Sequence, residues 1–358
     1  MSKAASTPKL QKDKVQAFQA KVLEDVAGFV SIACGSIGDK IGLYKALAVS
    51  GPVTPKELAE KTGTNERYVL EWLINQAASQ YVEYDPNSGK FSMSPENAAV
   101  LADEHSPYFA GGFFEVFSGF GQAVPTITEC FKTGKGMLWG DHAASVFSGT
   151  ERVFRPSYTY ELIPQWIPAI PGLRDKLEKG IKVADVGCGH GLSTIILAQE
   201  FPNSTFFGFD NHAPSIARAT EAAQEAGVSD RVKFVCTDAG AFTGSDYDLV
   251  AYFDCLHDMG DPVASCKRAV ETLKPDGCAM IIEPMGGAKV EDNFNLVGRV
   301  FSGASVMCCT PNAVASGNHS LGTIATDEAL EKVVKAGGFS TFRRVVATPF
   351  NRVFEAKV

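Results

Sequence analysis

The chain has 358 residues, 45% of them hydrophobic and 21% charged, with a formal net charge of −8. This length and composition predict about two ordinary globular domains. The acidic balance disfavours a broad surface for nucleic acid, which needs clustered positive charge.

The N-terminus and the cysteines limit the cellular setting further. The first twenty residues are polar and rich in lysine, unlike a secretory signal. No run approaches the roughly 20 apolar residues of a membrane span. The nine cysteines include no C-x-x-C pair, which favours free thiols over a disulfide framework or a zinc site. We therefore expect a cytoplasmic protein with no membrane partner and no metal.

A flexible polar tail is predicted for residues 1–15 and a winged-helix domain for residues 16–98. Apolar residues recur at helical spacing from Val15 to about Leu47. Three glycines interrupt that pattern, which predicts two helices with a tight junction. These glycines are Gly35, Gly38 and Gly42.

A helix–turn–helix and a hairpin are predicted next. Thr54 precedes a proline and stands three residues before Glu57, which is the pattern of a helix start. A glycine ends that helix, and Asn65 is placed to cap the following one. Alternating residues at 81–84 and 90–93 flank a Pro-Asn-Ser-Gly turn, which predicts the wing.

Residues 99–174 are predicted as a helical linker and substrate cap. The segment is rich in aromatic residues, most of which we expect in the core, although a pocket for a small molecule is also largely apolar. The candidates for substrate contact are Tyr158, Tyr160 and Trp166. Arg152 and Arg155 suit either an acidic substrate or ion pairs at the surface.

Residues 175–358 alternate strand and helix patterns, which predicts an α/β domain with a parallel, doubly wound sheet. The predicted strands are 182–186, 205–209, 232–236, 247–253, 277–283, 341–347 and 352–357. The last two are separated by Pro349 and predict a hairpin.

The stretch VADVGCGHG, residues 183–191, joins the first of these strands to a helix. Gly187, Gly189 and Gly191 predict a turn whose backbone approaches a ligand closely, because glycine lacks Cβ and tolerates positive φ. Their spacing differs from the G-x-G-x-x-G of dinucleotide-binding turns. Asp185, two residues before the first glycine, suits a cationic group such as the amino or sulfonium centre of S-adenosylmethionine.

Further acids follow the next strands in order. Asp210 ends the second strand and is placed for ribose hydroxyls. Asp238 and Ala239 follow the third strand, where a carboxylate and a backbone N–H can meet an adenine ring. Asp254 ends the fourth strand and is the last candidate cofactor ligand. Each acid alone is as consistent with a helix cap or a surface charge, and their common order indicates a cofactor site.

With these motifs, residues 175–358 resemble the class I S-adenosylmethionine-dependent methyltransferases. With the winged helix in front, the whole chain resembles bacterial small-molecule methyltransferases of the winged-helix type and is similar in architecture to plant O-methyltransferases. The resemblance implies a seven-stranded Rossmann-like sheet whose last strand is antiparallel. It also implies that Asp185 and the three glycines hold the methionine end of the cofactor, Asp210 the ribose, and Asp238 with Ala239 the adenine.

The segment LHDMGDP, residues 256–262, is similar to the LHDWxDE motif of the plant enzymes, whose His is a general base. His257 lies just beyond the fourth strand, where the methyl group is expected, and an imidazole with a pKa near ~6.5 suits proton transfer. Glu283 matches the Glu that orients this His in the family. A structural role for His257, capping the following helix or supporting the loop with Asp258, stays open. A second Glu of the plant pattern is missing before Asp327, which argues against a conventional phenol mechanism.

The expected function is methyl transfer from S-adenosylmethionine to a hydroxyl or thiol of a small molecule. The alternatives are transfer by proximity alone to an already deprotonated acceptor, a DNA-binding regulator, a nicotinamide-dependent dehydrogenase and a catalytically inactive relative. The second winged-helix helix carries Arg67 as its one cation among apolar residues. This composition disfavours DNA contact and predicts a homodimer through the N-terminal domain. The sequence leaves the acceptor unspecified.

Overall fold

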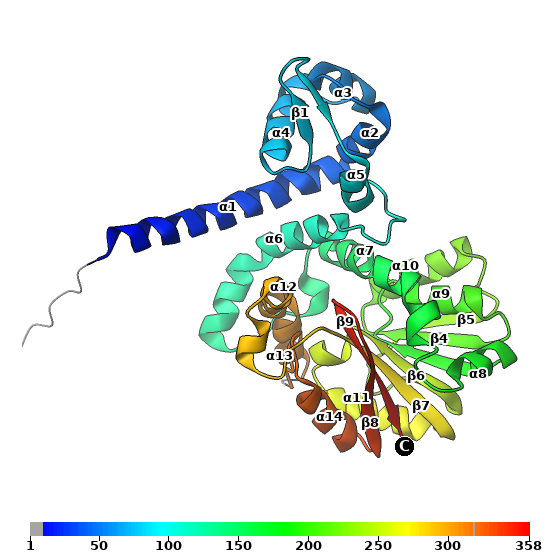
Figure 1. The fold of residues 1–358 in the computed structure, drawn as a ribbon. Coiled ribbons are helices and arrows are strands. Elements are labelled where there is room, and N and C mark those ends of the chain that lie inside the picture. Colours follow the sequence, from blue (N-terminus) through cyan, green and yellow to red (C-terminus); the bar gives the residue numbers. More distant parts are fainter. Residues whose placement is uncertain (1–9, 318) are drawn as a thin grey trace, which may run out of the picture. The chain divides into compact units, whose positions relative to one another are not determined.

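The computed structural model describes residues 10–317 and 319–358. The chain divides into two compact units, with the boundary between Phe114 and Glu115. The first unit is mostly helical, and the second contains a seven-stranded sheet with helices (Figure 1). The predicted α/β class with a helical N-terminal part is confirmed.

The first unit contains the predicted winged helix. A capping box between Thr54 and Glu57 starts α3, and the Asn65 side chain accepts the backbone N–H of Arg67 at the start of α4. The two strands of the wing pair in antiparallel fashion. The elements are α1 (Lys12–Lys40), α2 (Leu43–Ser50), α3 (Pro55–Thr62), α4 (Glu66–Ala78), β1 (Glu83–Asp85), β2 (Lys90–Ser92) and α5 (Pro95–Leu101).

Helix α1 is longer than the sequence predicted. It begins at Lys12, inside the expected tail, of which residues 1–9 lie outside the described part of the chain. It continues through Gly35 and Gly38, and the predicted junction falls at Gly42, which is left-handed with φ 76°. Within the described residues no single helix is long and apolar enough to cross a membrane, although α1 and α2, bent by 74° at their break, meet that test as a pair.

Close packing explains why Gly35 and Gly38 lie inside α1. The indole N–H of Trp72 donates to the carbonyl of Cys34 at 2.8 Å. One turn further along, a Cβ on Gly38 would overlap the same indole ring. A Cβ on Gly35 would lie 2.8 Å from the ring of Phe114. The glycines therefore allow aromatic rings to approach the helix, where the sequence pattern predicted a helix break.

The sheet of the second unit has the strand order β5–β4–β3–β6–β7–β9–β8. β3 pairs in parallel with β4 and β6, and β9 runs antiparallel to both β7 and β8. All seven predicted strands are confirmed, as is the antiparallel last strand. They are β3 (Lys182–Val186), β4 (Thr205–Asp210), β5 (Val232–Cys236), β6 (Tyr247–Phe253), β7 (Leu273–Pro284), β8 (Thr341–Ala347) and β9 (Asn351–Lys357).

Helices cover both faces of this sheet (Figure 1). Side chains of a strand point alternately to opposite faces, so Val183 packs with α8, α9 and α10 while Ala184 and Val186 pack with α11 and α14. These helices are α8 (Leu173–Lys179), α9 (Leu192–Glu200), α10 (Ala213–Glu225), α11 (Pro262–Thr272) and α14 (Asp327–Ala336). Because both faces are covered, the carboxyl ends of the parallel strands are left to build a site.

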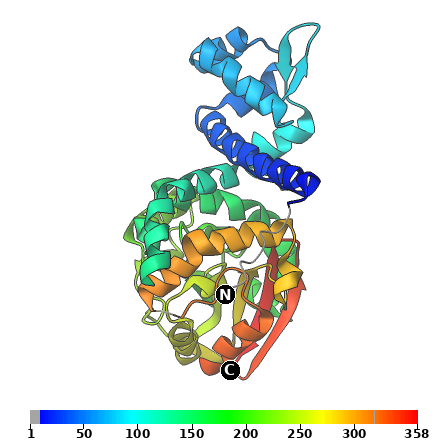
Figure 2. The same ribbon diagram turned by 90° about the vertical axis from the view of Figure 1, so that its left-hand side faces the viewer.

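The helical segment before β3 belongs largely to the same compact unit as the sheet. Tyr158 and Trp166 lie in the apolar cluster that contains Val183, whereas the sequence predicted a separate linker over 99–174. Further along the chain, η5 packs against α6, and Figure 2 shows orange α12 beside teal α6. The elements are α6 (Gly111–Thr133), η1 (Trp139–Asp141), α7 (Ala144–Tyr160), η2 (Leu162–Trp166), η4 (Val290–Asn293), α12 (Leu296–Ala304), η5 (Ser305–Cys309) and α13 (Thr310–Ser316).

The packing of Trp72 on α1 predicts that Gly38→Ala destabilises the first unit. The new methyl group has no room beside the indole, and overpacking of this kind costs about 1–3 kcal/mol. Gly28→Ala is the matched control, because Gly28 lies in the same helix with no atom within 4 Å of its built Cβ. The control should gain up to about 1 kcal/mol from helix propensity. Calorimetry of both variants checks the prediction, and equal stability of the two would contradict it.

Candidate active site

The predicted polar residues gather at one edge of the sheet. Asp185 lies on β3, Asp210 ends β4, and Asp238 follows β5. Asp254 follows β6, and Glu283 lies near the end of β7. These strands run in the same direction, so their carboxyl ends meet at one edge, where ligands of open α/β sheets bind.

The buried carboxyl group of Asp185 has hydrogen-bond partners in the described chain at one of its two oxygens. Its Oδ2 accepts hydrogen bonds from Ser193 at 2.7 Å and from Thr194 at 2.5 Å, both on the first turn of α9. Its Oδ1 is buried and has no hydrogen-bond partner among the residues that the structure describes. Burial raises the pKa of this carboxyl to about 6, against the opposing effect of the two hydroxyls. A cation beside Oδ1 would satisfy the oxygen and favour the ionised form.

The three positions in the turn after β3 require glycine for different physical reasons. A Cβ on Gly187 would lie 2.6 Å from the sulfur of Cys255, and one on Gly191 would overlap the ring of Phe234. Gly189 has φ 52°, and a Cβ added there would meet no neighbouring atom of the described chain within 4 Å. All three have positive φ, but only Gly189 faces the open space that close approach of a ligand requires.

Asp210 shapes this glycine turn from the neighbouring strand. Its Oδ2 accepts the backbone N–H of Gly189 at 2.9 Å, and its Oδ1 accepts that of His212 at 2.8 Å. Burial raises the pKa of Asp210, although the two N–H groups oppose the shift. Asp238 is exposed at the end of β5, with Oδ1 accepting the N–H of Gly240 at 2.8 Å, and Ala239 is half-buried beside it.

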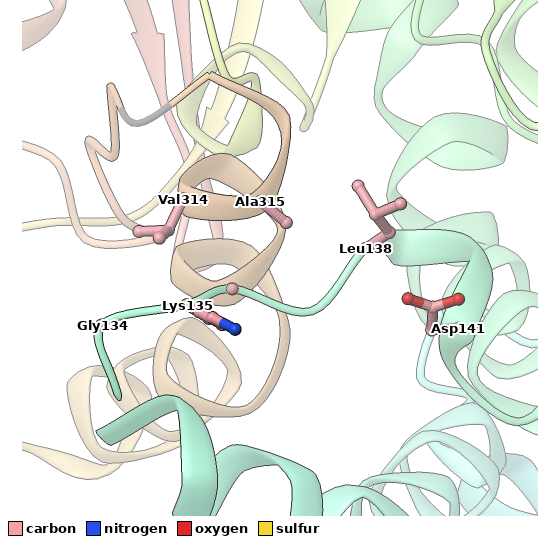
Figure 3. Close-up of a pocket in the computed structure, with 7 residues that line it drawn as sticks. Gly134, Lys135, Leu138, Asp141, Val314 and Ala315 are labelled. Atoms are coloured by element: carbon pink, nitrogen blue, oxygen red, sulfur yellow. The ribbon is translucent and has the colours of Figure 1, made fainter. Parts of the chain in front are cut away.

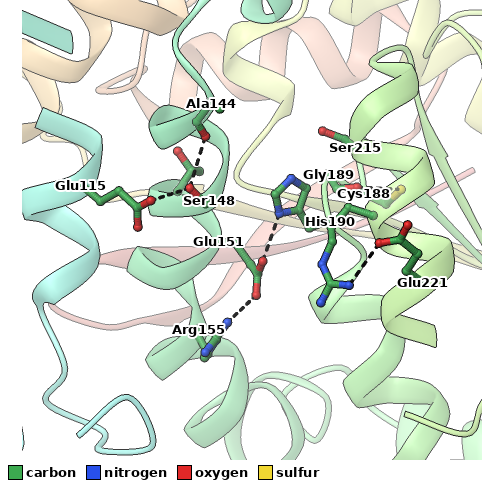
Figure 4. A network of polar contacts seen from close by, with 12 residues as sticks. Glu115, Ala144, Ser148, Glu151, Arg155, Cys188, Gly189, His190, Ser215 and Glu221 are labelled. Carbon is green, nitrogen blue, oxygen red and sulfur yellow. Dashed lines mark hydrogen bonds and ion pairs between the residues drawn. The ribbon is translucent and has the colours of Figure 1, made fainter. Parts of the chain in front are cut away.

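Helix α7 reaches the same turn through a hydrogen bond between Glu151 and His190 (Figure 4). Glu151 accepts from Nδ1 of His190 at 3.0 Å and from Arg155 at 2.6 Å. Burial opposes ionisation of Glu151, but His190 and Arg155 outweigh it and lower the pKa to about 2. Arg152 pairs with Glu115 at 2.8 Å. Both arginines therefore form ion pairs within the fold, the second of the two roles that the sequence left open.

Asp254 holds the chain where β6 ends. It has a left-handed backbone, with φ 53°. Its Oδ2 accepts from the hydroxyl of Tyr158 at 2.8 Å, and its Oδ1 accepts from Nδ2 of Asn351 at 2.7 Å. Burial raises the pKa of Asp254 to about 7. With both oxygens engaged by the protein, Asp254 anchors the following loop, and its cofactor contact stays a prediction.

His257 and Glu283 form a buried pair between the loop after β6 and the end of β7. Nδ1 of His257 donates to Oε2 of Glu283 at 2.6 Å. Oε1 of Glu283 accepts the backbone N–H groups of Leu256 at 3.0 Å and His257 at 3.3 Å. Burial alone would lower the pKa of His257, but Glu283 and Cys309 more than offset it and hold that pKa well above 6.5. Glu283 and Cys309 therefore favour the protonated ring, and Nε2 is the ring nitrogen that Glu283 does not hold.

An open pocket lies between helix α13 and the segment that follows α6 (Figure 3). Its lining residues are Gly134, Lys135, Gly136, Leu138, Asp141, Val314 and Ala315. The Asn312 side chain joins one wall to the other, since its Oδ1 accepts the N–H of Trp139 at 2.9 Å. Its Nδ2 donates to the carbonyl of Asp258 at 3.0 Å, so this wall also contacts the loop that carries His257.

Two parts of the chain match known domain families. Residues 177–337 match the family described as a methyltransferase domain, and residues 29–103 match the Rv2258c-like winged HTH domain. The chain has an S-adenosylmethionine-dependent methyltransferase domain C-terminal to a winged-helix domain. The predicted resemblance to methyltransferases with an N-terminal winged helix is thereby confirmed.

Individual relatives agree with this assignment. A ubiquinone biosynthesis O-methyltransferase of Cronobacter sakazakii is 33% identical over 99 residues, which are 27% of this chain and 40% of that protein. The chain thus spans about two fifths of this curated relative. The mitomycin 7-O-methyltransferase structure has a TM-score of 0.71 at 16% identity over 97% of this chain and 100% of that one. Human N-acetylserotonin methyltransferase, solved with S-adenosylmethionine, has a TM-score of 0.69 at 16% identity over 99% of each chain. At these identities the two structures establish the shared fold.

Two predicted substrate residues are part of the methyltransferase core. Trp166 is fully buried and Tyr158 is 7% exposed. Tyr158 packs edge-on against Trp166 and Phe253, with ring centroids 6.0 and 5.4 Å apart. We therefore assign both to the core rather than to a substrate pocket. Tyr160 is 43% exposed at the end of α7.

Several residues of the methyltransferase site escaped the sequence analysis. Ser193 and Thr194 directly follow the glycine turn, so their position was a usable signal for contact with Asp185. Asn351 and Glu151 carry no local signal, because their partners are 97 and 39 residues away. Cys309 lies near His257 and likewise belongs to a distant segment.

Proposed function

We propose that this protein transfers a methyl group from S-adenosylmethionine to a hydroxyl group of a small molecule, with His257 as the proton acceptor. The observation that carries the proposal is the buried His257–Glu283 pair at the strand edge that also holds Asp185 and Asp210. The names of the relatives support an oxygen acceptor, since they include O-methyltransferases. A thiol acceptor would need the same proton transfer.

The residues at the strand edge fit the cofactor. The unoccupied Oδ1 of Asp185 suits the cationic amino group of the methionine end. The open space at Gly189 admits a ligand against the backbone. Asp210 is placed for the ribose, and Asp238 with Ala239 for the adenine. When bound, S-adenosylmethionine supplies an electrophilic methyl group, and these residues bind and orient it.

The cofactor assignment predicts tight, pH-dependent binding of S-adenosylhomocysteine and negligible binding of NAD. Ionised Asp185 is the form that attracts an amino cation, and its pKa is about 6. Affinity should therefore fall as the pH is lowered through about 6. Asp185→Asn should weaken binding about 10- to 100-fold, the loss expected for a hydrogen bond to a charged group. Isothermal titration calorimetry from pH 5 to 8 measures both effects.

Asp230→Asn provides the control for this calorimetry, because Asp230 is exposed and, among the residues that the structure describes, forms an ion pair with the adjacent Arg231. Its affinity should match that of the unmodified protein. Binding of NAD without binding of S-adenosylhomocysteine would contradict the assignment.

His257 acts on the acceptor, and Glu283 acts through His257. Glu283 fixes the ring by holding Nδ1 and two backbone N–H groups, which leaves Nε2 to take the acceptor's proton. By raising the pKa of His257, Glu283 stabilises the imidazolium that forms on transfer, and the fraction of neutral ring able to accept a proton grows as the pH rises. Loss of the proton leaves the acceptor oxygen as a nucleophile, and orientation by the site brings it to the methyl carbon.

Replacing His257 with Ala should lower turnover by roughly 10²–10⁴, the contribution of a general base. Affinity for S-adenosylmethionine should stay within a few-fold, and the loss should shrink at high pH as the acceptor ionises unaided. Glu283→Gln should lower kcat with little change in KM, since it disturbs the base rather than the binding of substrate. Release of S-adenosylhomocysteine across a panel of phenols, aliphatic alcohols, thiols and amines measures these rates and identifies the acceptor.

His105→Ala, in the first unit, is the control for the His257 variant and should leave turnover unchanged. Undiminished turnover of His257→Ala at neutral pH would remove His257 from catalysis. Methyl transfer would then proceed by proximity alone to an acceptor that is already deprotonated.

We also propose that the first unit forms a homodimer rather than a complex with DNA. Helix α1 has 29 residues and spans about 43 Å at the usual rise per residue. An exposed apolar stripe follows one side of it, including Val15, Phe18, Val22, Val26 and Phe29. Packing against the same stripe of a second protein molecule would remove these side chains from water. On α4, the cation Arg67 is paired with Glu71 at 2.5 Å, which leaves little charge for phosphates.

Light scattering should give about twice the 38.2 kDa chain mass. The double variant Phe18→Glu, Phe29→Glu should be monomeric, because each charge would be buried in the paired stripe. Ala17→Glu, on the side of the same helix away from the stripe, is the control and should stay dimeric. A monomeric unmodified protein that shifts duplex DNA at physiological salt would reverse the proposal.

A further inference from the structure

Three side chains with metal-binding atoms converge beside the ring of His257. One ring nitrogen of His257, a carboxylate oxygen of Asp258 and the sulfur of Cys309 all lie within 4.8 Å of one another. His257 and Asp258 belong to η3 (Leu256–Asp258), and Cys309 ends η5. His257 is buried, while Asp258 and Cys309 are half-buried. The group is therefore enclosed by protein and still reachable from solvent.

The donor set selects a particular kind of cation. Nitrogen, sulfur and oxygen ligands together suit Zn²⁺ and similar soft divalent ions. Mg²⁺ and Ca²⁺ prefer oxygen ligands alone. Zinc bonds of about 2.0 Å to nitrogen and 2.3 Å to sulfur place tetrahedral ligands roughly 3.5 Å apart. The three side chains thus need to converge by about 1 Å, and three protein ligands leave a fourth position open.

The surroundings of His257 match those of a metal-binding imidazole. Such a ring almost always donates its other N–H to a carboxylate, carbonyl or water. Glu283 accepts from Nδ1 at 2.6 Å, so Nε2 is the nitrogen with a lone pair for a cation. Backbone contacts fix the loop itself: Glu283 holds two of its N–H groups, and Asn312 donates to the carbonyl of Asp258 at 3.0 Å.

We propose that His257, Asp258 and Cys309 form a binding site for a soft divalent cation such as Zn²⁺, and that the bound cation inhibits methyl transfer. Coordination uses the Nε2 lone pair that otherwise accepts the acceptor's proton. The inhibitory consequence rests on the proposed function, whereas cation binding does not. The sequence predicted no metal because the third ligand, Cys309, is 51 residues away from Asp258 and no ligand spacing is visible.

Co²⁺ is the probe for the site, because a cobalt–thiolate bond gives a charge-transfer absorption in the near ultraviolet. The unmodified protein should show that band at one Co²⁺ per chain, and Zn²⁺ should displace it. Cys309→Ser should lose the band, while Cys236→Ser, which changes an exposed thiol elsewhere in the same unit, should retain it. Circular dichroism confirms that each variant is folded. An absent band, or a band retained in Cys309→Ser, would overturn the site.

Glu283→Gln separates a metal site from a chance cluster, because it leaves all three ligands in place. Loss of such a supporting contact typically lowers metal affinity 10- to 100-fold, and Co²⁺ titration should show this weakening. Unchanged affinity in this variant would contradict the role of His257 as a ligand.

The inhibitory part is tested by methyl-transfer assays with added Zn²⁺. The Zn²⁺ concentration that halves the rate should rise at least tenfold in Cys309→Ser, each variant being compared with its own rate without metal. Co²⁺ binding without inhibition would overturn the regulatory part alone. A protein that binds Co²⁺ as predicted but methylates no acceptor would refute the proposed function and leave the cation site supported.

Discussion

The carboxylate of Glu283 ties the loop after β6 to the end of β7. It is fully buried and accepts two backbone N–H groups and the ring N–H of His257. A buried charge is tolerable only when several donors surround it, so the loop has one favourable arrangement. The tautomer, orientation and basicity of His257 follow from this contact. The placement of Asp258 toward Cys309 follows from the same loop.

Burial governs the rest of the strand edge. Asp185, Asp210 and Asp254 all have raised pKa values because the sheet and its helices exclude water around them. Each carboxylate is stabilised where donors reach it: hydroxyls for Asp185, backbone N–H groups for Asp210, and side chains for Asp254. The oxygen of Asp185 that lacks a donor is therefore a preferred place for a cationic ligand. Burial thus affects the proposed cofactor residues and the proposed proton acceptor alike.

Much of the fold was predictable from local pattern. The seven strands and the winged helix follow from alternating apolar residues, helix caps and turn residues, which act over a few positions. The glycine turn and the acids after each strand were also predictable, because parallel strands bring their carboxyl ends together. Gly35 and Gly38 inside α1 were misinterpreted as a break, since the rings that need their space, Phe114 and Trp72, lie more than thirty residues away.

The sequence by itself determined the class of fold, the strand edge at which the candidate site lies, and the candidate pair of His257 with Glu283. Only the tertiary structure decided that Asp254 is held by Tyr158 and Asn351, that Glu151 of α7 pairs with the glycine turn, and that Cys309 lies beside His257. Local pattern reports which face of a strand or helix is buried. Contacts between side chains far apart in the chain depend on how the elements pack, and no periodicity records that packing.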